Sequence, residues 1–462
     1  MAFNKAIVVM AAGAGTRFKS NKSKLLHNFA GKPIIKYLSS LLADLKDTQV
    51  IFVVSYQKDE VVKVVGEAKN FVFAEQKVLD GTAGAVKVSL PYIGKAVKKV
   101  AVIPGDTPLI PIGLIKDLLN DKNDVSVVGS KLKTPKGFGR IKMDSKGIIK
   151  EIIEETDLSG ADKKINLVNT SIYSFNRDFL EQGISSIQIN KNKKEFYLTD
   201  IVKLAVKKGK KIKCIEFENS ELVLGANDRA GMLECARKIW LDRADVYLNN
   251  GVTLIDPSSV YIDDECNIKK DVEVYPNVFL TGDTVLEEGV VVLEGCRINN
   301  SKIGAGSVVG PYVIIDGSDI GDENKIGPFT FVRPGTKTSR KVKIGGFVET
   351  KKAVVGSGSK IPHLSYVGDA LIGDNVNVGC GVITCNYDGF KKHITEIGDN
   401  AFIGSDCQLI APIKIAKNSY VAAGTTVTKD VPEESLAISR TPQKNLEGYA
   451  KKIKDKKSKK QG

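Results

Sequence analysis

Residues 397–427 read IGDNAFIGSDCQLIAPIKIAKNSYVAAGTTV. In this stretch an aliphatic residue returns at every sixth position: Ile397, Ile403, Leu409, Ile415, Val421 and Val427. A period of six makes each repeat one face of a triangular coil, in which the aliphatic side chain points inward and stacks on its counterpart one turn below. The stretch therefore predicts a parallel β-helix of hexapeptide repeats.

The same spacing extends toward the N-terminus, to about residue 250. It includes Ile262, Ile268, Val274, Leu280, Leu286, Val292 and Ile298, and after some slippage it returns at Ile303, Val309 and Ile315. Glycine often follows the aliphatic residue, as in Ile303-Gly304 and Ile403-Gly404. Unrelated short strands would not keep one spacing over so many repeats, so the β-helix is the favoured interpretation.

Two segments interrupt the spacing. Arg333–Val342 is polar and rich in lysine and arginine, and Thr384–Glu396 contains the run CNYDGFKK at residues 385–392. In a rigid coil such interruptions become protruding loops, which is where binding groups can be placed. We expect both segments to form loops.

The N-terminal half has a different pattern, in which short β-branched runs alternate with helical stretches. This alternation is typical of a mostly parallel sheet covered by helices. Expected strands are 7–11, 50–55, 100–103, 125–128 and 212–217, and expected helices are 33–45, 82–89 and 198–207. Apolar residues at helical spacing in 229–248 predict a connecting helix. The expected organisation is an α/β domain at 1–228, a linker helix at 229–249, the β-helix at 250–437, and a segment at 438–462 with a disordered lysine-rich tail.

Composition says more about the cellular compartment of the protein than about its function. The formal net charge of +14 suits an enzyme of anionic substrates as well as a nucleic-acid binder, so charge alone does not separate the two. The seven cysteines are odd in number and form no C-x-x-C pair, which favours a reducing, cytoplasmic location. No apolar run approaches the roughly 18 residues that span a bilayer, so we expect no membrane insertion. The short apolar run at 6–12 is better explained as a buried strand than as a signal peptide.

A glycine-rich turn follows the first expected strand. Gly13 and Gly15 let the backbone approach a polyphosphate, and Thr16 and Arg17 add a donor and a fixed positive charge. Phe18 rules out a dinucleotide fingerprint, and no Gly-Lys-Ser/Thr follows as in a P-loop. Downstream lie Lys24 and Asp106, the latter at the end of the strand 100–103, where open α/β sheets bind ligands. A structural turn is the alternative explanation for the two glycines, and an isolated Gly-Asp such as Gly105-Asp106 is usually a plain turn.

Taken together, the motifs of this half resemble the sugar-1-phosphate nucleotidyltransferases. The motifs are G-x-GTR at 13–17, Lys24, EQ-x4-GTA at 75–83, GD-x-PL at 105–109 and FYLTD at 196–200. With the β-helix, nearly the whole chain resembles the bacterial bifunctional N-acetylglucosamine-1-phosphate uridyltransferase/glucosamine-1-phosphate acetyltransferase family. The resemblance implies a Rossmann-like nucleotidyltransferase domain with a mostly parallel sheet, followed by an all-β left-handed parallel β-helix. It also implies synthesis of UDP-N-acetylglucosamine for peptidoglycan and lipopolysaccharide.

For the uridylyltransferase site, the resemblance implies that Arg17 and Lys24 are catalytic and that Asp106 and Asn227 hold Mg²⁺. The sugar phosphate is already anionic, so no general base is required, and the cations offset the repulsion between two anions. The implied nucleotide- and sugar-binding residues are Met10, Ala11, Ala12, Gly13, Lys24, Gln76, Gly81, Thr82, Gly105, Gly139, Glu154, Asn169 and Asn227.

The second half contains two of the three histidines, His363 and His393. Two histidines make a three-histidine zinc site implausible within one chain. Glucosamine's amine is largely protonated near neutrality, and one imidazole is enough to take that proton. By resemblance His363 is this base. The implied sugar-phosphate residues are Arg333, Lys351, Tyr366, Asn377 and Lys392, and the implied acetyl-CoA residues are Cys380, Asn386, Tyr387, Ser405, Ala423 and Arg440.

The chain departs from the family pattern at a few positions. Ala14 replaces a frequent lysine, Ser23 a usual proline, and Pro104 a residue that is often aromatic or polar. Cys380 replaces a usual alanine beside the thioester cofactor. None of these changes removes an implied metal ligand.

Two other functions remain open at this point. One is a single-activity sugar-1-phosphate nucleotidyltransferase whose β-helix is a non-catalytic trimerising module. The other is a trimerising scaffold without catalysis, which would have no use for Asp106 with Asn227 or for His363. The expected partners are UTP, glucosamine-1-phosphate, N-acetylglucosamine-1-phosphate, acetyl-CoA and two further copies of the chain in a homotrimer, with no nucleic acid.

Overall fold

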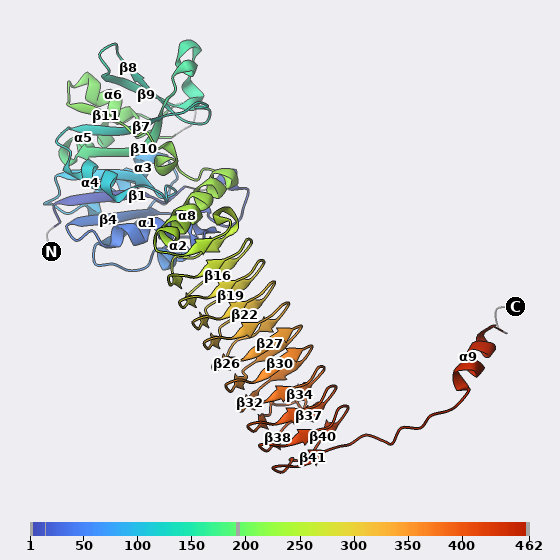
Figure 1. Cartoon of the computed structure of the whole chain (residues 1–462). Coiled ribbons are helices and arrows are strands. Elements are labelled where there is room, and N and C mark those ends of the chain that lie inside the picture. Colours follow the sequence, from blue (N-terminus) through green and yellow to red (C-terminus); the bar gives the residue numbers. More distant parts are fainter. Residues whose placement is uncertain (1–2, 14, 191–194, 459–462) are drawn as a thin grey trace. The chain divides into compact units, whose positions relative to one another are not determined.

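The computed structural model describes residues 3–13, 15–190 and 195–458. It divides the chain into two compact units, residues 1–239 and residues 240–462, called here the N-terminal and C-terminal units (Figure 1). The division falls between Ile239 and Trp240, within the helix α8, Arg229–Asn249. In the described part of the chain, no helix has the length and apolar composition needed to cross a membrane.

The N-terminal unit is built on a nine-stranded sheet with the main order β11-β7-β10-β6-β1-β4-β5. The strands are β1 (Lys5–Met10), β4 (Thr48–Val54), β5 (Phe71–Glu75), β6 (Lys99–Pro104), β7 (Val125–Lys131), β8 (Arg140–Met143), β9 (Ile149–Ile153), β10 (Leu167–Asn176) and β11 (Ile212–Glu216). Only β10 runs antiparallel within the main order, and the β8–β9 hairpin attaches to it. A separate two-stranded ribbon is formed by β2 (Asn28–Phe29) and β3 (Lys32–Pro33). The mostly parallel sheet predicted from the sequence is confirmed.

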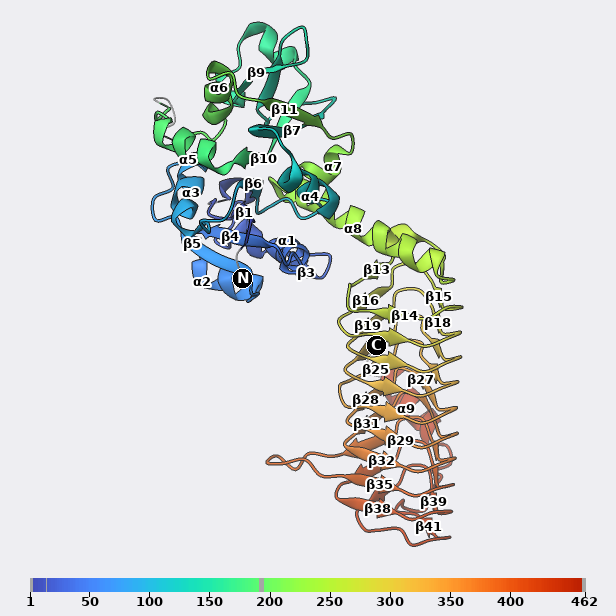
Figure 2. The same ribbon diagram turned by 90° about the vertical axis from the view of Figure 1, so that its left-hand side faces the viewer.

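Helices cover both faces of this sheet. They are α1 (Ile34–Ala43), α2 (Lys58–Val65), α3 (Thr82–Ser89), α4 (Ile112–Asn120), α5 (Arg177–Ser186), α6 (Asp200–Lys207) and the short α7 (Ser220–Val223). Helices α3, α5 and α6 share one apolar core with the central strands, while α1 and α4 lie on the other side (Figure 2). All seven residues of β4 are buried, which explains why residues 50–54 are apolar without interruption rather than alternating with polar residues.

The C-terminal unit is a left-handed parallel β-helix of hexapeptide repeats, as the sequence predicts. In all but one of the strand pairs of the coil, a strand pairs with the strand three positions later, so Ile262 lies beside Leu280 and Leu280 beside Ile298. Three hexapeptides therefore make one turn, and three sheets run along the coil (Figures 1 and 2).

The three sheets contain the following strands. The first has β12 (Thr253–Leu254), β15 (Glu273–Val274), β18 (Val291–Val292), β21 (Val308–Val309), β24 (Lys325–Ile326), β27 (Lys343–Gly346), β30 (Lys360–His363), β33 (Asn377–Val378), β36 (Phe402–Ile403), β39 (Tyr420–Val421) and β41 (Leu436–Ala437). The second has β13 (Tyr261–Ile262), β16 (Phe279–Thr281), β19 (Arg297–Asn299), β22 (Ile314–Asp316), β25 (Phe331–Val332), β28 (Glu349–Lys351), β31 (Tyr366–Gly368), β34 (Ile383–Cys385), β37 (Gln408–Ile410) and β40 (Thr426–Val427). The third has β14 (Asn267–Ile268), β17 (Val285–Leu286), β20 (Lys302–Ile303), β23 (Asp319–Ile320), β26 (Lys337–Thr338), β29 (Val354–Val355), β32 (Ala370–Ile372), β35 (Thr395–Ile397) and β38 (Ile413–Ile415).

The aliphatic residues of the six-residue spacing form the core of the coil. All sixteen of those named above are buried, from Ile262 to Val427. The prediction of inward stacking is therefore confirmed.

The prediction of a loop at Arg333–Val342 is wrong. Strand β26 lies inside this segment, and Thr338 takes the inward place six residues after Val332 and six before Ile344. The polar side chain is tolerated there because the Thr338 hydroxyl accepts the N–H of Gly321 at 3.1 Å. The second interruption is a real insertion, since Thr384 and Ile397, both inward, are separated by a projecting hairpin (Figure 2).

The lysine-rich tail differs from the expected disordered segment. It contains a helix, α9 (Tyr449–Ser458), whose described side chains are all exposed. Lysine and alanine are good helix formers, so local propensity supports a helix here without burial.

Truncation of one inward side chain tests the stacked core. Leu280→Ala removes a fully buried side chain between Ile262 and Ile298, so the free energy of unfolding should fall by about 2–5 kcal/mol. Denaturant unfolding followed by circular dichroism measures the change. Asn267→Ala, at an exposed position of β14, is the control and should change stability little. Equal effects of the two substitutions would contradict the stacked core.

Candidate active sites

A cavity of about 560 Å³ opens at the carboxyl ends of the parallel strands of the N-terminal unit. Its walls bring together all but one of the residues predicted for the uridylyltransferase site: Met10, Ala11, Ala12, Gly13, Arg17, Lys24, Gln76, Gly81, Thr82, Asp106, Gly139, Glu154, Asn169 and Asn227. The exception is Gly105, which lies behind the wall and donates its N–H to Met10 O at 2.9 Å. A Cβ on Gly105 would come within 3.1 Å of the same oxygen, so its role is to let β1 and β6 end close together.

The glycine-rich turn leads into a short helical turn, Thr16–Phe18, that presents Arg17 to the cavity. Gly15 has a positive φ of 62°, and the Lys24 side chain packs against its backbone. Phe18 is buried beneath the turn, and its carbonyl accepts the Arg229 Nε–H at 3.2 Å. Ala14, a departure from the family pattern, lies outside the described residues.

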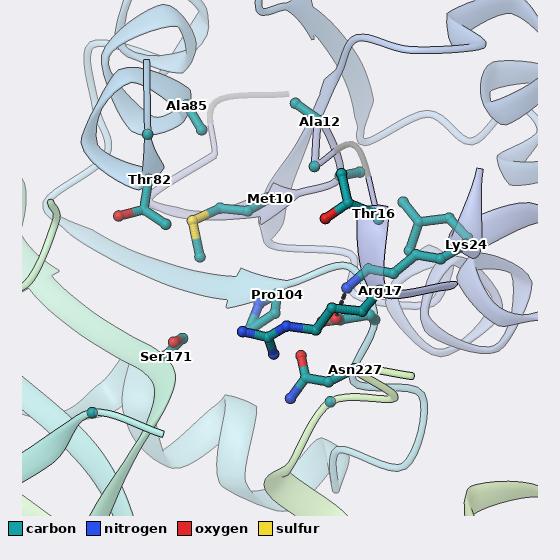
Figure 3. A pocket seen from close by; sticks show the side chains of 18 of the residues that line it. Met10, Ala12, Thr16, Arg17, Lys24, Thr82, Ala85, Pro104, Ser171 and Asn227 are labelled. Carbon is teal, nitrogen blue, oxygen red and sulfur yellow. Dashed lines mark hydrogen bonds and ion pairs between the residues drawn. The ribbon is translucent and has the colours of Figure 1, made fainter. Parts of the chain in front are cut away.

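Lys24 and Asp106 form an ion pair that is largely buried. The loop of Gly225 closes over this pair, because the Ala226 N–H donates to Asp106 O at 2.8 Å and the absent side chain of Gly225 leaves room for the Asp106 carboxylate. The side chains of Arg17, Lys24 and Asn227 converge on this side of the cavity, opposite Thr82 and Ala85 (Figure 3).

This arrangement can hold a hard divalent cation. The described residues contain no cluster of three or more His, Cys, Asp or Glu side chains suited to a metal. Asp106 and Asn227 nevertheless supply a carboxylate and an amide oxygen, and the Lys24 ammonium shows that the carboxylate accepts a cation here. Mg²⁺ is typically held by one or two protein oxygens and completes its shell with water and substrate phosphates, so two protein ligands suffice.

Gln76, Gly81 and Thr82 form the wall of the cavity opposite the Arg17 and Lys24 side chains. Hydrogen bonds fix the position of this wall. The Gln76 amide donates to Asp80 Oδ1 at 3.0 Å and to Gly81 O at 3.3 Å. Thr82 begins α3, and its hydroxyl accepts the Leu198 N–H at 3.0 Å. The FYLTD motif, to which the sequence assigns no separate role, therefore anchors this wall.

The remaining wall carries Glu154 and Asn169, each held by a residue that sequence reasoning missed. Thr199 donates its hydroxyl to Glu154 Oε1 at 3.0 Å, and burial raises the pKa of the Glu154 carboxyl. Asn169 Nδ2 donates to the hydroxyl of the fully buried Tyr173 at 2.7 Å, and burial also raises the pKa of that phenol. Thr199 belongs to the FYLTD motif and so had a signal in the sequence, whereas Tyr173 looks like an ordinary strand residue.

In the C-terminal unit, one corner of the coil carries a column of predicted residues. His363, Cys380, Ser405 and Ala423 occupy equivalent places in four successive turns. Backbone hydrogen bonds at this corner join each turn to the next: Gly381 N–H donates to Leu364 O, Asp406 N–H to Cys380 O and Gly424 N–H to Ser405 O. These four residues, with Asn377, line a groove of about 460 Å³. Arg440 lies outside the groove lining, but it donates to Ala423 O at 3.0 Å and so continues the column.

A second cluster lies on the neighbouring sheet. The side chains of Lys351 and Lys392 meet, and this contact, with burial and the nearby Arg333 guanidinium, lowers the pKa of Lys351. The Tyr366 hydroxyl and the Asn386 amide both lie over Gly368, where a Cβ would collide with them. Tyr387 is exposed on the hairpin. The Ser365 hydroxyl donates to His363 O at 2.7 Å at the corner that joins the groove to the strand of Tyr366.

The chain was compared with known protein families and with individual proteins. Residues 6–244 match the nucleotidyl transferase model, and residues 394–429 match the bacterial transferase hexapeptide (six repeats) model. The bifunctional protein GlmU of Carboxydothermus hydrogenoformans is 42% identical over 449 residues, which cover 96% of this chain and 99% of that protein. The chain belongs to the bifunctional GlmU family. Its relatives from Geotalea uraniireducens (41% identity, 98% of this chain and 100% of that protein) and Pelobacter propionicus (39%, 98% and 99%) carry the same name.

GlmU membership confirms the resemblance drawn from the sequence. The chain is an enzyme that combines a nucleotidyltransferase with a hexapeptide acetyltransferase. It also decides against the two alternatives, a single-activity nucleotidyltransferase with a passive β-helix and a non-catalytic scaffold, since the chain matches proteins named bifunctional GlmU over nearly their whole length.

Substitution of Gly81 tests the cavity wall of this GlmU family member. Gly81 has a positive φ of 104°, and a Cβ would lie 2.5 Å from Phe196 O, so Gly81→Ala must shift the wall. We expect kcat/KM for UTP in a pyrophosphate-release assay to fall by about 10- to 100-fold. Gly147→Ala is a matched control, because its φ is also positive, at 76°, but nothing lies within 4 Å of the new Cβ. A Gly81 variant with normal kinetics would contradict the proposed wall.

Proposed function

We propose that the chain carries out two consecutive transfers. The C-terminal unit moves the acetyl group of acetyl-CoA to the amine of glucosamine-1-phosphate. The N-terminal unit then joins the resulting N-acetylglucosamine-1-phosphate to UTP, giving UDP-N-acetylglucosamine, a cell-wall precursor, and pyrophosphate. The observation that carries the proposal is the meeting of Arg17, Lys24, Asp106 and Asn227 in one cavity of a GlmU family member.

In the uridylyl transfer, a sugar-phosphate oxygen attacks the α-phosphorus of UTP, and the bond to the departing pyrophosphate breaks. Arg17 and Lys24 stabilise the negative charge that develops on the phosphates, and the glycine-rich turn lets the backbone approach them. Mg²⁺ bound at Asp106 and Asn227 would add further charge neutralisation at the triphosphate. Gln76, Gly81 and Thr82 orient the base, while Glu154 and Asn169 bind the sugar hydroxyls.

In the acetyl transfer, the imidazole of His363 takes a proton from the amine, whose lone pair attacks the thioester carbonyl. The bond from carbon to sulfur breaks, and CoA leaves as a thiolate that is reprotonated. Arg333, Lys351 and Lys392 form a cationic cluster suited to the sugar phosphate. Cys380, Ser405, Ala423 and Arg440 provide the corner along which acetyl-CoA lies, with Asn386 and Tyr387 from the hairpin.

We also propose that three copies assemble through their β-helices and that the enzyme works in the cytoplasm. The exposed face of the coil supports assembly, since Tyr312, Phe329 and Phe347 stack along it with ring centroids 5.5 and 5.4 Å apart. All seven cysteines are free thiols, which fits a reducing compartment.

Two substitutions separate the activities. His363→Ala should abolish CoA release and leave pyrophosphate release from UTP and N-acetylglucosamine-1-phosphate unchanged, because the His363 side chain lies in the C-terminal unit. Asp106→Ala should lower pyrophosphate release by at least about 100-fold and leave CoA release unchanged. Each variant is the control for the other. Loss of both activities from His363→Ala would mean that this residue is structural, and retained CoA release would remove it as the base.

A further inference from the structure

The hairpin that interrupts the coil, residues 386–393, has no core of its own. It lies between β34 and β35 and projects from the coil (Figure 2), and Phe390 near its tip is 93% exposed. Such a loop cannot be held by apolar burial. It nevertheless carries Lys392, which must meet Lys351 for the cationic cluster to form.

Polar contacts hold the hairpin instead, and the Asn386 amide also ties its base to Asp369 at 2.6 Å. Its ends are joined by His393 N to Asn386 O at 2.8 Å and by the antiparallel bridge of Tyr387 with Lys392. At the turn, Asp388 Oδ1 accepts the N–H groups of Phe390 and Lys391, each at 2.8 Å. These bonds fix the backbone on both sides of the turn.

The second oxygen of the same carboxylate binds the far end of the hairpin. His393 Nε2 lies 2.7 Å from Asp388 Oδ2, so one carboxylate joins the turn to the residue directly after Lys392. The N–H of Lys391, the His393 ring and the N–H of Phe390 together hold the pKa of Asp388 well below its usual range. The carboxylate is therefore charged at neutral pH and uses both of its oxygens within the hairpin.

The cationic cluster needs such a restraint. Lys392 faces the ammonium group of Lys351, and like charges repel. The Arg333 guanidinium, although paired with Glu349 at 2.7 Å, adds to this repulsion, and the Asp369 carboxylate offsets only part of it, since the pKa of Lys351 is still lowered. A flexible lysine would turn away into solvent when no anion is bound. A cluster held in place beforehand binds an anion without the cost of ordering these side chains.

We infer that His393 is a positioning residue for the sugar-phosphate site, acting through Asp388 to hold Lys392 against Lys351. The inference rests on the proposed acetyltransferase function. His393 does not touch the reacting atoms in this assignment, and its loss changes the binding of the sugar phosphate rather than the chemical step.

Binding and kinetics of three variants test the inference. His393→Ala should raise the dissociation constant of glucosamine-1-phosphate, measured by calorimetry, and its KM by about tenfold, with kcat changed less than about threefold. His393→Gln can still donate to Asp388 and should restore most of the affinity. Lys391→Ala is the matched control: it removes a cation from the same hairpin, but Lys391 takes part in the hairpin contacts through its backbone N–H and carbonyl, which the substitution keeps. Hydrogen exchange should speed up at the hairpin amides in His393→Ala alone.

The outcomes are distinguishable from failure of the proposed function. If the unsubstituted chain binds glucosamine-1-phosphate without releasing CoA, the acetyltransferase proposal fails, while the calorimetry still tests the inference. Unchanged affinity in His393→Ala, or equal weakening in Lys391→Ala, would overturn it. A large loss of kcat with normal KM would also overturn it, because His393 would then take part in the chemistry.

Discussion

The coil of the C-terminal unit depends on one repeated contact, in which an inward side chain of each hexapeptide packs on its counterpart in the turn before. Ile262, Leu280 and Ile298 show the pattern, since each is buried and each pairs with the next. This packing keeps the spacing of successive turns constant, so residues at one corner of the coil form a straight column. His363, Cys380, Ser405 and Ala423 line one groove for that reason, although 60 residues separate the first from the last.

The same constraint explains why the cationic cluster needs an insertion. A regular coil offers short strands and tight corners, and its side chains cannot reach far from the surface. The insertion between Thr384 and Ile397 projects a hairpin without disturbing the stacked core, since both flanking residues stay buried. In the N-terminal unit the corresponding constraint is the close approach of β1 and β6, which needs glycine at position 105 and places Asp106 beside Lys24.

Much of this fold could be predicted because local patterns dictate it. The six-residue period identifies inward residues such as Ile403, and the β-branched runs identify strands such as β4. At Thr338 the period continues but the aliphatic residue is missing, because a hydroxyl bonded to Gly321, 17 residues earlier, takes its inward place. The residues of both sites could be predicted because they belong to sequence motifs. Tyr173, which holds Asn169, belongs to no motif. The contact of His393 with Asp388 could not be predicted either, because it depends on how the hairpin folds.

We propose that one chain joins two separate chemistries through N-acetylglucosamine-1-phosphate, and a mixing experiment tests this most directly. Neither His363→Ala nor Asp106→Ala alone should make UDP-N-acetylglucosamine from glucosamine-1-phosphate, acetyl-CoA, UTP and Mg²⁺. A mixture of the two variants should make it, because each supplies the step that the other lacks. A mixture that stays inactive, while each variant retains its remaining activity, would contradict the account.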